Sequence, residues 1–385
     1  MKRMLTGLLA LCLLWQGIPT AFAAGKEAKS SGVAVSAKSV ILVERETGTV
    51  LYQQAEHEKL EPASVTKVMT MLLVAEAIDG GQISMDDQVT CSAYAASMGG
   101  SQVYLEEGEQ MSVHDLLKAV AVASGNDAAV ALAEFVSGSE SAFVDKMNQR
   151  AAELGMKDTH FCNCNGLPAK GHVTSAYDIA LMSCQLLKHD LIREYTGTWM
   201  DTIRDGEFQL ANTNKLIYYY DGATGLKTGS TSSAGFCISA SALRDDMELV
   251  AVVLGSSTSK ERFDSAKALL NYGFGAYALA DVTPKEALPA LPVKMGEADT
   301  VQVGLSEVGK LLVKKDQLSS VTTEVELKES LQAPVAKGAE VGQLVISVDG
   351  KEARRIALVT QAEVPRLTFS GIFSGMLERM ATGHA

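Results

Sequence analysis

The feature that most restricts how this chain can fold is a long apolar run that contains one lysine. Residues 61–78, EPASVTKVMTMLLVAEAI, predict a helix that is buried on all sides in the middle of a globular core. Lys67 lies within this run, three positions after Ser64. A buried ammonium group without a partner is costly in free energy, so Lys67 needs either a partner or a chemical task.

The composition is that of an ordinary globular protein. The chain has 385 residues, which is enough for two domains with sizeable cores. It is 47% hydrophobic and 21% charged, and its formal net charge is -12. An acidic chain without a run of lysine or arginine offers no surface that could follow a phosphate backbone, so we exclude nucleic acid as a partner.

The N-terminal residues have the pattern of a secretory signal peptide. A basic start precedes an apolar core over residues 5–15, and residues 21–23, AFA, form a small-x-small cleavage site. The apolar core is too short for a transmembrane anchor, and Pro19 interrupts its end. We therefore expect cleavage after Ala23, a polar linker over residues 24–33, and export to the outer face of the cytoplasmic membrane or the cell wall.

The cysteines indicate neither a disulfide framework nor a metal site. Of the 6 cysteines, Cys12 would leave with the signal peptide, and an odd number without framework spacing remains. His160, Cys162 and Cys164 are separated by gaps of one residue, which are unusual for zinc, so we expect no metal. The remaining thiols are predicted to be free: Cys91, Cys162, Cys164, Cys184 and Cys237.

Strand patterns occur early and late in the chain, on either side of a helical block. Residues 39–54 predict a hairpin, and residues 235–255 predict two strands joined at Asp245-Asp246. Between them, residues 65–193 are mostly helical by periodicity, and a further helix is expected over residues 262–277. This order predicts an α+β domain whose sheet joins segments from both ends.

One helix of the central block can be described in more detail. Ser141 is the predicted N-cap of the helix in SAFVDKMNQRAAELGM. Phe143, Met147 and Ala151 follow at helical spacing and share one face, which should therefore be buried.

The pattern changes after about residue 280, where short alternating runs predict a small β domain. At the extreme C-terminus, apolar residues at helical spacing predict an amphipathic helix, which could pack on the β domain or lie on a membrane surface. We favour peripheral membrane attachment through the segment after Pro365. The expected organisation is a signal peptide at 1–23, a linker at 24–33, an α+β domain at 34–276, a β-rich domain at 277–363 and a C-terminal helix at 364–385.

The spacing of Ser64 and Lys67 has a chemical interpretation. A helix places residues three apart on one face, so the lysine amine should reach the serine hydroxyl. Burial lowers the pKa of a lysine, and a neutral amine can act as general base for a serine nucleophile. The motif S-x-x-K alone is weak, because Ser257 and Lys260 also fit it in a polar loop.

Two further motifs make the interpretation specific. Ser124-Gly125-Asn126 lies at a break between helical segments, and Lys227-Thr228-Gly229 lies on a predicted strand. The order S-x-x-K, S-x-N, K-T-G resembles the penicillin-recognising serine enzymes. SGNDAAVALAEFVSGS, FVDKMNQRAAELGMKDTHF, NTNKL and GATGLKTG are similar to the low-molecular-mass penicillin-binding proteins that act as D-alanyl-D-alanine carboxypeptidases. The resemblance implies a β-lactamase/transpeptidase-like catalytic domain over residues 34–276, with an antiparallel sheet flanked by helices.

The resemblance also implies roles for the three motifs. Ser64 would attack the carbonyl between the two terminal D-alanines of a peptidoglycan stem peptide, and Lys67 would take its proton. Ser124 would pass a proton towards the leaving amine, and Asn126 would bind the peptide of the substrate. β-Lactam antibiotics would acylate Ser64, and no cofactor or metal is implied.

The third motif would hold the end of the substrate. Lys227 and Thr228 would bind the terminal carboxylate through charge-assisted hydrogen bonds. Gly229 would let the substrate lie along the strand. The backbone N–H groups of Ser64 and Ser230 would form the oxyanion hole. A histidine is not needed, and the sequence gives no sign of partners for the histidines.

Three other functions use the same motifs. A serine β-lactamase would need a deacylating glutamate in an E-x-x-L-N loop, and the nearest string, EFQLAN, sets Glu207 and Asn212 one residue too far apart. A D,D-endopeptidase that cuts cross-links would need no further group. A penicillin-binding sensor that acylates once without turnover would also keep all three motifs.

Overall fold

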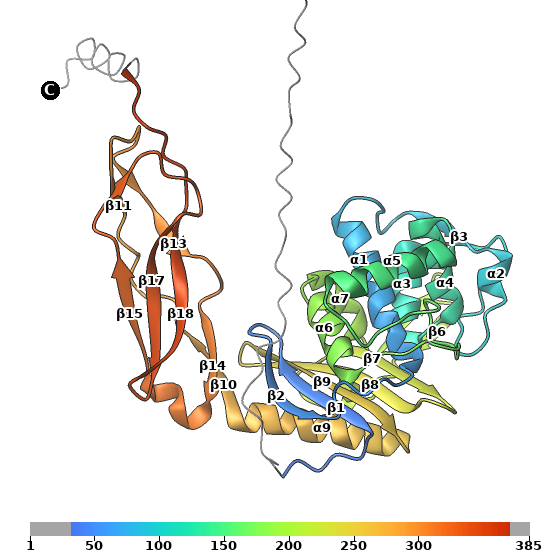
Figure 1. Ribbon diagram of the computed structural model, residues 1–385. Coiled ribbons are helices and arrows are strands. Elements are labelled where there is room, and N and C mark those ends of the chain that lie inside the picture. The colour runs from blue at the N-terminus through green and yellow to red at the C-terminus, as the bar shows by residue number, and fades with distance from the viewer. Residues whose placement is uncertain (1–31, 370–385) are drawn as a thin grey trace, which may run out of the picture.

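The computed structural model describes residues 32–369, which form an α+β domain followed by a β-rich domain (Figure 1). A five-stranded antiparallel sheet with the order β2-β1-β9-β8-β7 is the centre of the first domain. It joins strands from both ends of that domain, which confirms the predicted α+β class. The strands are β1 (Ser39–Glu44), β2 (Thr49–Gln54), β7 (Ala223–Thr231), β8 (Gly235–Arg244) and β9 (Met247–Ser256).

The two predicted strand turns are both present. The hairpin of β1 and β2 closes through residues 45–48. Asp245 and Asp246 connect β8 to β9 and have φ angles of 48° and 59°. Two successive positive φ angles match the twist of a tight hairpin, and aspartate tolerates this conformation better than most residues.

Helices cover both faces of the sheet, so the domain has three layers (Figure 1). Alternate residues of β1 show the division: Ile41 and Val43 pack towards the larger helical cluster, whereas Val40 and Leu42 pack towards α9. The helices of this domain are α1 (Lys67–Asp79), α2 (Ala93–Ala96), α3 (Val113–Lys118), α4 (Asn126–Ser137), α5 (Glu140–Glu153), α6 (Ala176–Leu186), α7 (Asp190–Thr196), α8 (Leu216–Tyr219) and α9 (Ser259–Ala276), with a 3₁₀ turn η1 (Ala63–Thr66) and a π-helical turn η2 (Ala119–Ala123).

The helix α1 is the buried helix that the apolar run predicts. Every residue from Lys67 to Ala75 is buried, because the helix is surrounded by other elements, including α4 and α6. The first turn, η1, lies against β7 and β8 of the sheet. The serine of the S-x-x-K motif is therefore held between the helical layer and the sheet.

Two details of the central block differ from the prediction. Ser139, and not Ser141, is the N-cap of α5, since its hydroxyl accepts from the backbone N–H of Ala142 at 3.2 Å. The helix therefore begins at Glu140, directly after this cap. The predicted apolar face of Phe143, Met147 and Ala151 is buried as expected. The block also contains a small hairpin, β3 (Gln88–Thr90) with β4 (Gln110–Ser112). The sequence did not predict it, because strands of 3 residues carry too little periodicity to be recognised.

A second small hairpin lies between α7 and α8. It consists of β5 (Met200–Ile203) and β6 (Phe208–Ala211), which pair antiparallel. β6 leads into the segment Asn212–Asn214, which connects the hairpin to α8 and the K-T-G strand.

As far as residue 369, the C-terminal domain consists of strands and one 3₁₀ turn, and it has its own core of aliphatic side chains. It starts directly after α9, where β10 pairs with β14. Its largest sheet has the order β13-β18-β17-β15. The elements are β10 (Tyr277–Asp281), β11 (Leu291–Lys294), β12 (Thr300–Val301), β13 (Val303–Leu305), β14 (Lys310–Lys314), η3 (Lys315–Ser320), β15 (Val321–Leu327), β16 (Leu331–Gln332), β17 (Glu340–Val348) and β18 (Lys351–Thr360).

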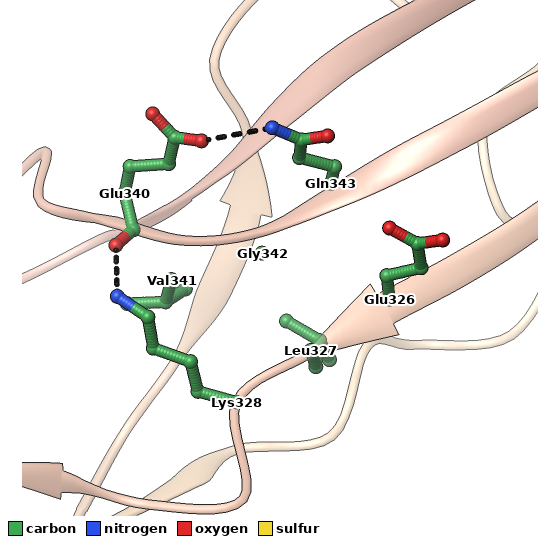
Figure 2. Close-up of a pocket in the computed structure, with 7 residues that line it drawn as sticks. All are labelled: Glu326, Leu327, Lys328, Glu340, Val341, Gly342 and Gln343. Carbon is green, nitrogen blue, oxygen red and sulfur yellow. Dashed lines mark hydrogen bonds between the residues drawn. The ribbon is translucent and has the colours of Figure 1, made fainter.

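Figure 2 shows a shallow pocket at one end of β15 and β17. Its walls are held by the Lys328 amine, which donates to the Glu340 carbonyl at 3.1 Å, and by Gln343 Nε2, which donates to the Glu340 carboxylate at 3.2 Å. No residue of the three sequence motifs lines this pocket. Any site built by those motifs therefore lies in the α+β domain.

The predicted terminal segments fall mostly outside the described residues. The signal peptide and nearly all of the linker precede residue 32, and most of the predicted C-terminal helix follows residue 369. Before that point the chain is still part of the β domain, because Val364 pairs with Val335 and the Leu367 N–H donates to the Met295 carbonyl at 2.9 Å. None of the helices within residues 32–369 is long and apolar enough to cross a membrane.

Candidate active site

Ser64 and Lys67 meet at the junction of η1 and α1. Lys67 Nζ lies 3.1 Å from Ser64 Oγ. It also donates to Asn126 Oδ1 at 2.5 Å and to the Asn165 carbonyl at 2.7 Å. The Lys67 side chain is fully buried, so its position is set by these three neighbours.

This geometry suits a neutral amine. Burial lowers the pKa of Lys67 from 10.5 to about 7, against a smaller opposing influence of Cys164 and Asp127. A neutral amine has two N–H donors and one lone pair. The two carbonyl oxygens of Asn126 and Asn165 take the donors, which leaves the lone pair for the hydroxyl proton of Ser64. A buried lysine in this state is a general base.

The S-x-N motif lies at a break between α3 and α4, as predicted. The π-helical turn η2 ends at Ser124, whose φ of 65° is left-handed and turns the chain before α4 begins at Asn126. Ser124 and Asn126 are both buried. The Asn126 amide is held from both ends, because its Oδ1 accepts from Lys67 and its Nδ2 donates to the Gly99 carbonyl at 2.6 Å. Asn126 thus orients the amine of Lys67.

The K-T-G motif forms the part of β7 that passes η1. A Cβ added to Gly229 would lie 2.8 Å from Ser64 N and 2.9 Å from the Pro62 carbonyl, so only glycine fits here. Lys227 and Thr228 are buried, and Ser230 is exposed. Thr228 Oγ1 donates to Thr213 Oγ1 at 2.7 Å. The edge strand of the sheet therefore runs directly beside the backbone of Ser64.

Basic side chains lie around this strand, and the described residues give them no carboxylate partner. Burial lowers the pKa of Lys227 well below its ordinary value, and the nearby charges of Lys67 and Arg262 add to this effect. Arg262, on α9, is buried and donates to the carbonyls of Gly229 at 3.2 Å and Cys237 at 3.3 Å. Neither Lys227 nor Arg262 forms an ion pair with a carboxylate in the described part of the chain. An anion bound here would satisfy both groups.

Sequence reasoning missed the loop that supports Lys67 from the opposite side. The Asn165 carbonyl accepts from Lys67, and Gly166 follows with a φ of +85°. A Cβ added to Gly166 would lie 1.9 Å from the Ala63 carbonyl, so the loop presses against η1. The pair Asn165-Gly166 is a turn signal that could have marked a close backbone approach.

The sequence gives no sign of the partners of the histidines, which the structure shows most clearly for His172. The backbone N–H of Cys162 donates to His172 Nδ1 at 3.0 Å, so the proton is on Nε2, which lies 2.7 Å from Thr66 Oγ1. Thr66 in turn donates to the Ala63 carbonyl at 2.9 Å. Burial lowers the pKa of His172 to about 4, so the ring stays neutral. It braces η1 and does not reach Ser64 through any hydrogen bond among residues 32–369.

These observations define a class of protein. The pairing of a serine hydroxyl with a buried neutral amine, next to a sheet edge whose basic side chains lack acidic partners, is that of a serine acyl-transfer enzyme for anionic peptides. No group of His, Cys, Asp and Glu that could hold a metal ion occurs within residues 32–369.

Comparisons with known proteins agree with this class. The family profile described as D-alanyl-D-alanine carboxypeptidase matches residues 24–258, and that of the penicillin-binding protein 5 C-terminal domain matches residues 282–366. The chain is 44% identical to D-alanyl-D-alanine carboxypeptidase DacF of Bacillus subtilis over 374 residues, which is 96% of each chain. It is 33% identical to DacA of Escherichia coli over 346 residues, 88% of this chain and 86% of that one.

Solved structures give the same result. Penicillin-binding protein 5 of Haemophilus influenzae has a TM-score of 0.75 and 31% identity, with coverage of 89% of this chain and 100% of that one. Penicillin-binding protein D2 of Listeria monocytogenes, solved in the ampicillin-bound form, has a TM-score of 0.58 and 32% identity, with coverage of 63% and 99%. The chain therefore belongs to the D-alanyl-D-alanine carboxypeptidase family of low-molecular-mass penicillin-binding proteins.

Proposed function

We propose that this chain removes the terminal D-alanine from peptidoglycan pentapeptide stems through an acyl-enzyme on Ser64. The observation that carries the proposal is the environment of Lys67. Lys67 Nζ lies within hydrogen-bond distance of Asn126 Oδ1, the Asn165 carbonyl and Ser64 Oγ, so the neutral amine can donate to the two carbonyl oxygens and turn its lone pair to the Ser64 hydroxyl at 3.1 Å. This arrangement prepares Ser64 for attack on a carbonyl carbon.

The reaction has two balanced halves. Ser64 Oγ forms a bond to the carbonyl carbon while its proton moves to Lys67, and the peptide C–N bond breaks as the leaving amine receives a proton. We assign this second transfer to Ser124, which gives its hydroxyl proton to the amine and is reprotonated by Lys67; Ser124 lies on the S-x-N turn together with Asn126, the residue that holds Lys67. Water then attacks the ester carbon with neutral Lys67 as base, the ester C–O bond breaks, and the proton taken from the water passes from Lys67 to Ser64 Oγ. In addition to its contact with Lys67, Asn126 is proposed to form a hydrogen bond with the peptide of the substrate.

The substrate is assigned to the edge of β7. Its terminal carboxylate would lie near Lys227 and Thr228, where it would supply the anion that this positive region lacks. Its backbone would extend along Gly229 and Ser230, as an added strand does. The N–H groups of Ser64 and Ser230 would stabilise the oxyanion, where one donor is typically worth about 3 kcal/mol. The close approach of Gly229 to the backbone of Ser64 supports this assignment.

The same nucleophile is proposed to open β-lactams, and this follows the ampicillin-bound relative from Listeria. A β-lactamase function is not favoured. Glu207 is exposed in the β5–β6 turn. The Asn212 side chain donates to the carbonyls of Thr196 at 3.2 Å and Thr198 at 2.7 Å. Neither is available to direct a hydrolytic water.

The test is release of D-alanine from a peptide that ends in D-Ala-D-Ala, measured by mass spectrometry over many equivalents per enzyme. Sustained release supports the proposal. A penicilloyl adduct on Ser64 without D-alanine release would favour an endopeptidase or a sensor instead. Sustained rapid hydrolysis of penicillin would favour a β-lactamase.

We further propose export and peripheral membrane attachment through the segment after Pro365, on the sequence patterns of the two termini. Full-length mature protein should sediment with lipid vesicles, and protein truncated before Arg366 should not. Equal partition of the two would overturn the attachment. The N-terminal residue of protein purified from an exporting cell tests cleavage after Ala23.

A further inference from the structure

The segment Asn212–Asn214 connects β6 to α8 and places a threonine beside the K-T-G strand. Its two asparagines are buried, and the side chains of both form hydrogen bonds. Asn212 binds the Thr196 and Thr198 carbonyls through Nδ2 and the Asn214 N–H through Oδ1. Asn214 donates to the Gly225 carbonyl at 2.8 Å and accepts from the Leu216 N–H at 3.1 Å. These hydrogen bonds fix the position of the segment beside β7.

Thr213 stands between these asparagines and contacts two of the three motif regions. Its backbone N–H donates to the Val122 carbonyl in η2, two residues before Ser124, at 3.2 Å. Its Oγ1 accepts from Thr228 Oγ1 at 2.7 Å. Thr213 is half-buried, whereas both of its asparagine neighbours are buried. Thr213 is the residue of this segment whose side chain contacts a side chain of the K-T-G motif itself, that of Thr228.

The direction of the hydrogen bond determines what remains available. Thr228 donates its hydroxyl proton to Thr213 Oγ1, so the Thr213 hydroxyl proton is the one that can still be donated to a substrate. No acceptor for it occurs among the contacts of residues 32–369. The nearby cations Lys227 and Arg262 also have no carboxylate partner in that part of the chain.

We propose that the Thr213 hydroxyl, which accepts from Thr228, donates to the terminal carboxylate of the substrate and so contributes to the preference for a free C-terminus. The proposal rests on the carboxypeptidase function proposed above. In this arrangement Thr228 donates to Thr213, and Thr213 donates to one carboxylate oxygen, while Arg262 lies close behind the strand through its hydrogen bond to the Gly229 carbonyl. A hydrogen bond to a charged acceptor is stronger than one to a neutral amide. The contact therefore favours a substrate with a C-terminal carboxylate over one with a C-terminal amide.

The experiment compares two peptides that differ only at the C-terminus, one ending in D-Ala-D-Ala and one in D-Ala-D-Ala-amide. Release of D-alanine and of D-alaninamide is quantified by mass spectrometry for wild type, Thr213→Val and Thr213→Ser. The pH is kept above the pKa of about 7 of Lys67. Thr198→Val is the matched control, because the Thr198 hydroxyl donates to the Glu194 carbonyl at 2.6 Å on the neighbouring turn.

We expect Thr213→Val to lower kcat/KM for the carboxylate peptide by about tenfold to a hundredfold, the range of a lost charge-assisted hydrogen bond. The loss for the amide peptide should be smaller, so that the carboxylate-to-amide ratio falls. Thr213→Ser should restore the ratio, and Thr198→Val should leave it unchanged.

Two results would overturn or separate the claims. An unchanged ratio in Thr213→Val, with or without equal losses for both peptides, overturns the carboxylate contact, because equal losses would mean that Thr213 only positions Thr228. Absence of D-alanine release by the wild type itself would instead refute the proposed function, which distinguishes the two failures.

Discussion

The chain contains the motif S-x-x-K twice, and the two copies have opposite environments. Ser64 and Lys67 lie between the helical layer and the sheet, and the Lys67 side chain is fully buried. Ser257 and Lys260 lie at the start of α9, and the Lys260 side chain is 86% exposed. The same spacing thus produces a possible base in one place and a solvated surface charge in the other.

The charges of the two lysines differ for the same reason. Burial lowers the pKa of Lys67 to about 7, and its partners are neutral carbonyl oxygens. A hydrogen bond from Lys260 to the Asp264 carboxylate at 2.5 Å raises the pKa of Lys260. A motif of this kind therefore becomes chemically meaningful only through burial and the nature of the partners.

The largest difference between the copies should appear on removal of each serine. Ser64→Ala should abolish the penicilloyl adduct and lower D-alanine release at least about a thousandfold, as the loss of a nucleophile does. Ser257→Ala should leave both unchanged. Intact-mass spectrometry with penicillin and the D-alanine assay measure the two effects. An adduct that persists in Ser64→Ala would place the nucleophile elsewhere.

Removal of each lysine should show the next largest difference. Lys67→Met keeps the length of the side chain but removes the amine, and we expect acylation to slow by about a hundredfold to ten-thousandfold, the usual contribution of a general base. Lys260→Met should acylate at the wild-type rate. Stopped-flow acylation with a chromogenic cephalosporin measures the rates. Comparable rates in the two variants would remove Lys67 from the mechanism.

The packing around the first copy can be tested through glycine. Gly166→Ala would place a Cβ 1.9 Å from the Ala63 carbonyl, at a φ of +85°, and should both destabilise the protein and misplace η1. We expect a loss of about 2 kcal/mol or more in the free energy of unfolding. Gly275→Ala, on α9, meets open space and should leave stability equal or slightly higher. Urea unfolding compares the two, and equal stabilities would contradict the tight contact of the loop with η1.

The last comparison concerns the pH dependence of stability. Between about 7 and 10.5 the unfolded chain binds a proton at Lys67 that the native protein does not, so the free energy of unfolding rises with pH through that interval. Lys67→Met should remove this rise, and Lys260→Met should keep it. Urea unfolding at several pH values measures the slope as a difference from wild type. Identical slopes for Lys67→Met and wild type would show that Lys67 is charged when buried.

The sequence was sufficient for those features that local pattern determines. The buried helix α1, the hairpin turn at Asp245 and Asp246, and the break at Ser124 follow from apolar runs, turn residues and a helix interruption. The spacing of Ser64 and Lys67 also predicted their proximity, because residues three apart share a helical face.

Contacts between distant segments could not be predicted in this way. Asn165, His172, Arg262 and Thr213 reach the site from other elements, and no local period or spacing links them to Ser64. His172 illustrates the reason: it stands in a polar stretch of sequence, yet folding buries it against Thr66, 106 positions away. Such residues are recognised only once the topology is known.

The central claim is that Lys67 works as a neutral base, and the pH profile of Ser64 acylation tests it most directly. The rate constant for penicilloyl-adduct formation should be measured by quenched-flow mass spectrometry from about pH 5 to 9, a range that spans the lowered pKa of about 7. The account predicts that the rate rises with pH, with a midpoint near 7, and then reaches a plateau. A rate that is constant across this range, or that rises only near the ordinary lysine pKa, would contradict it.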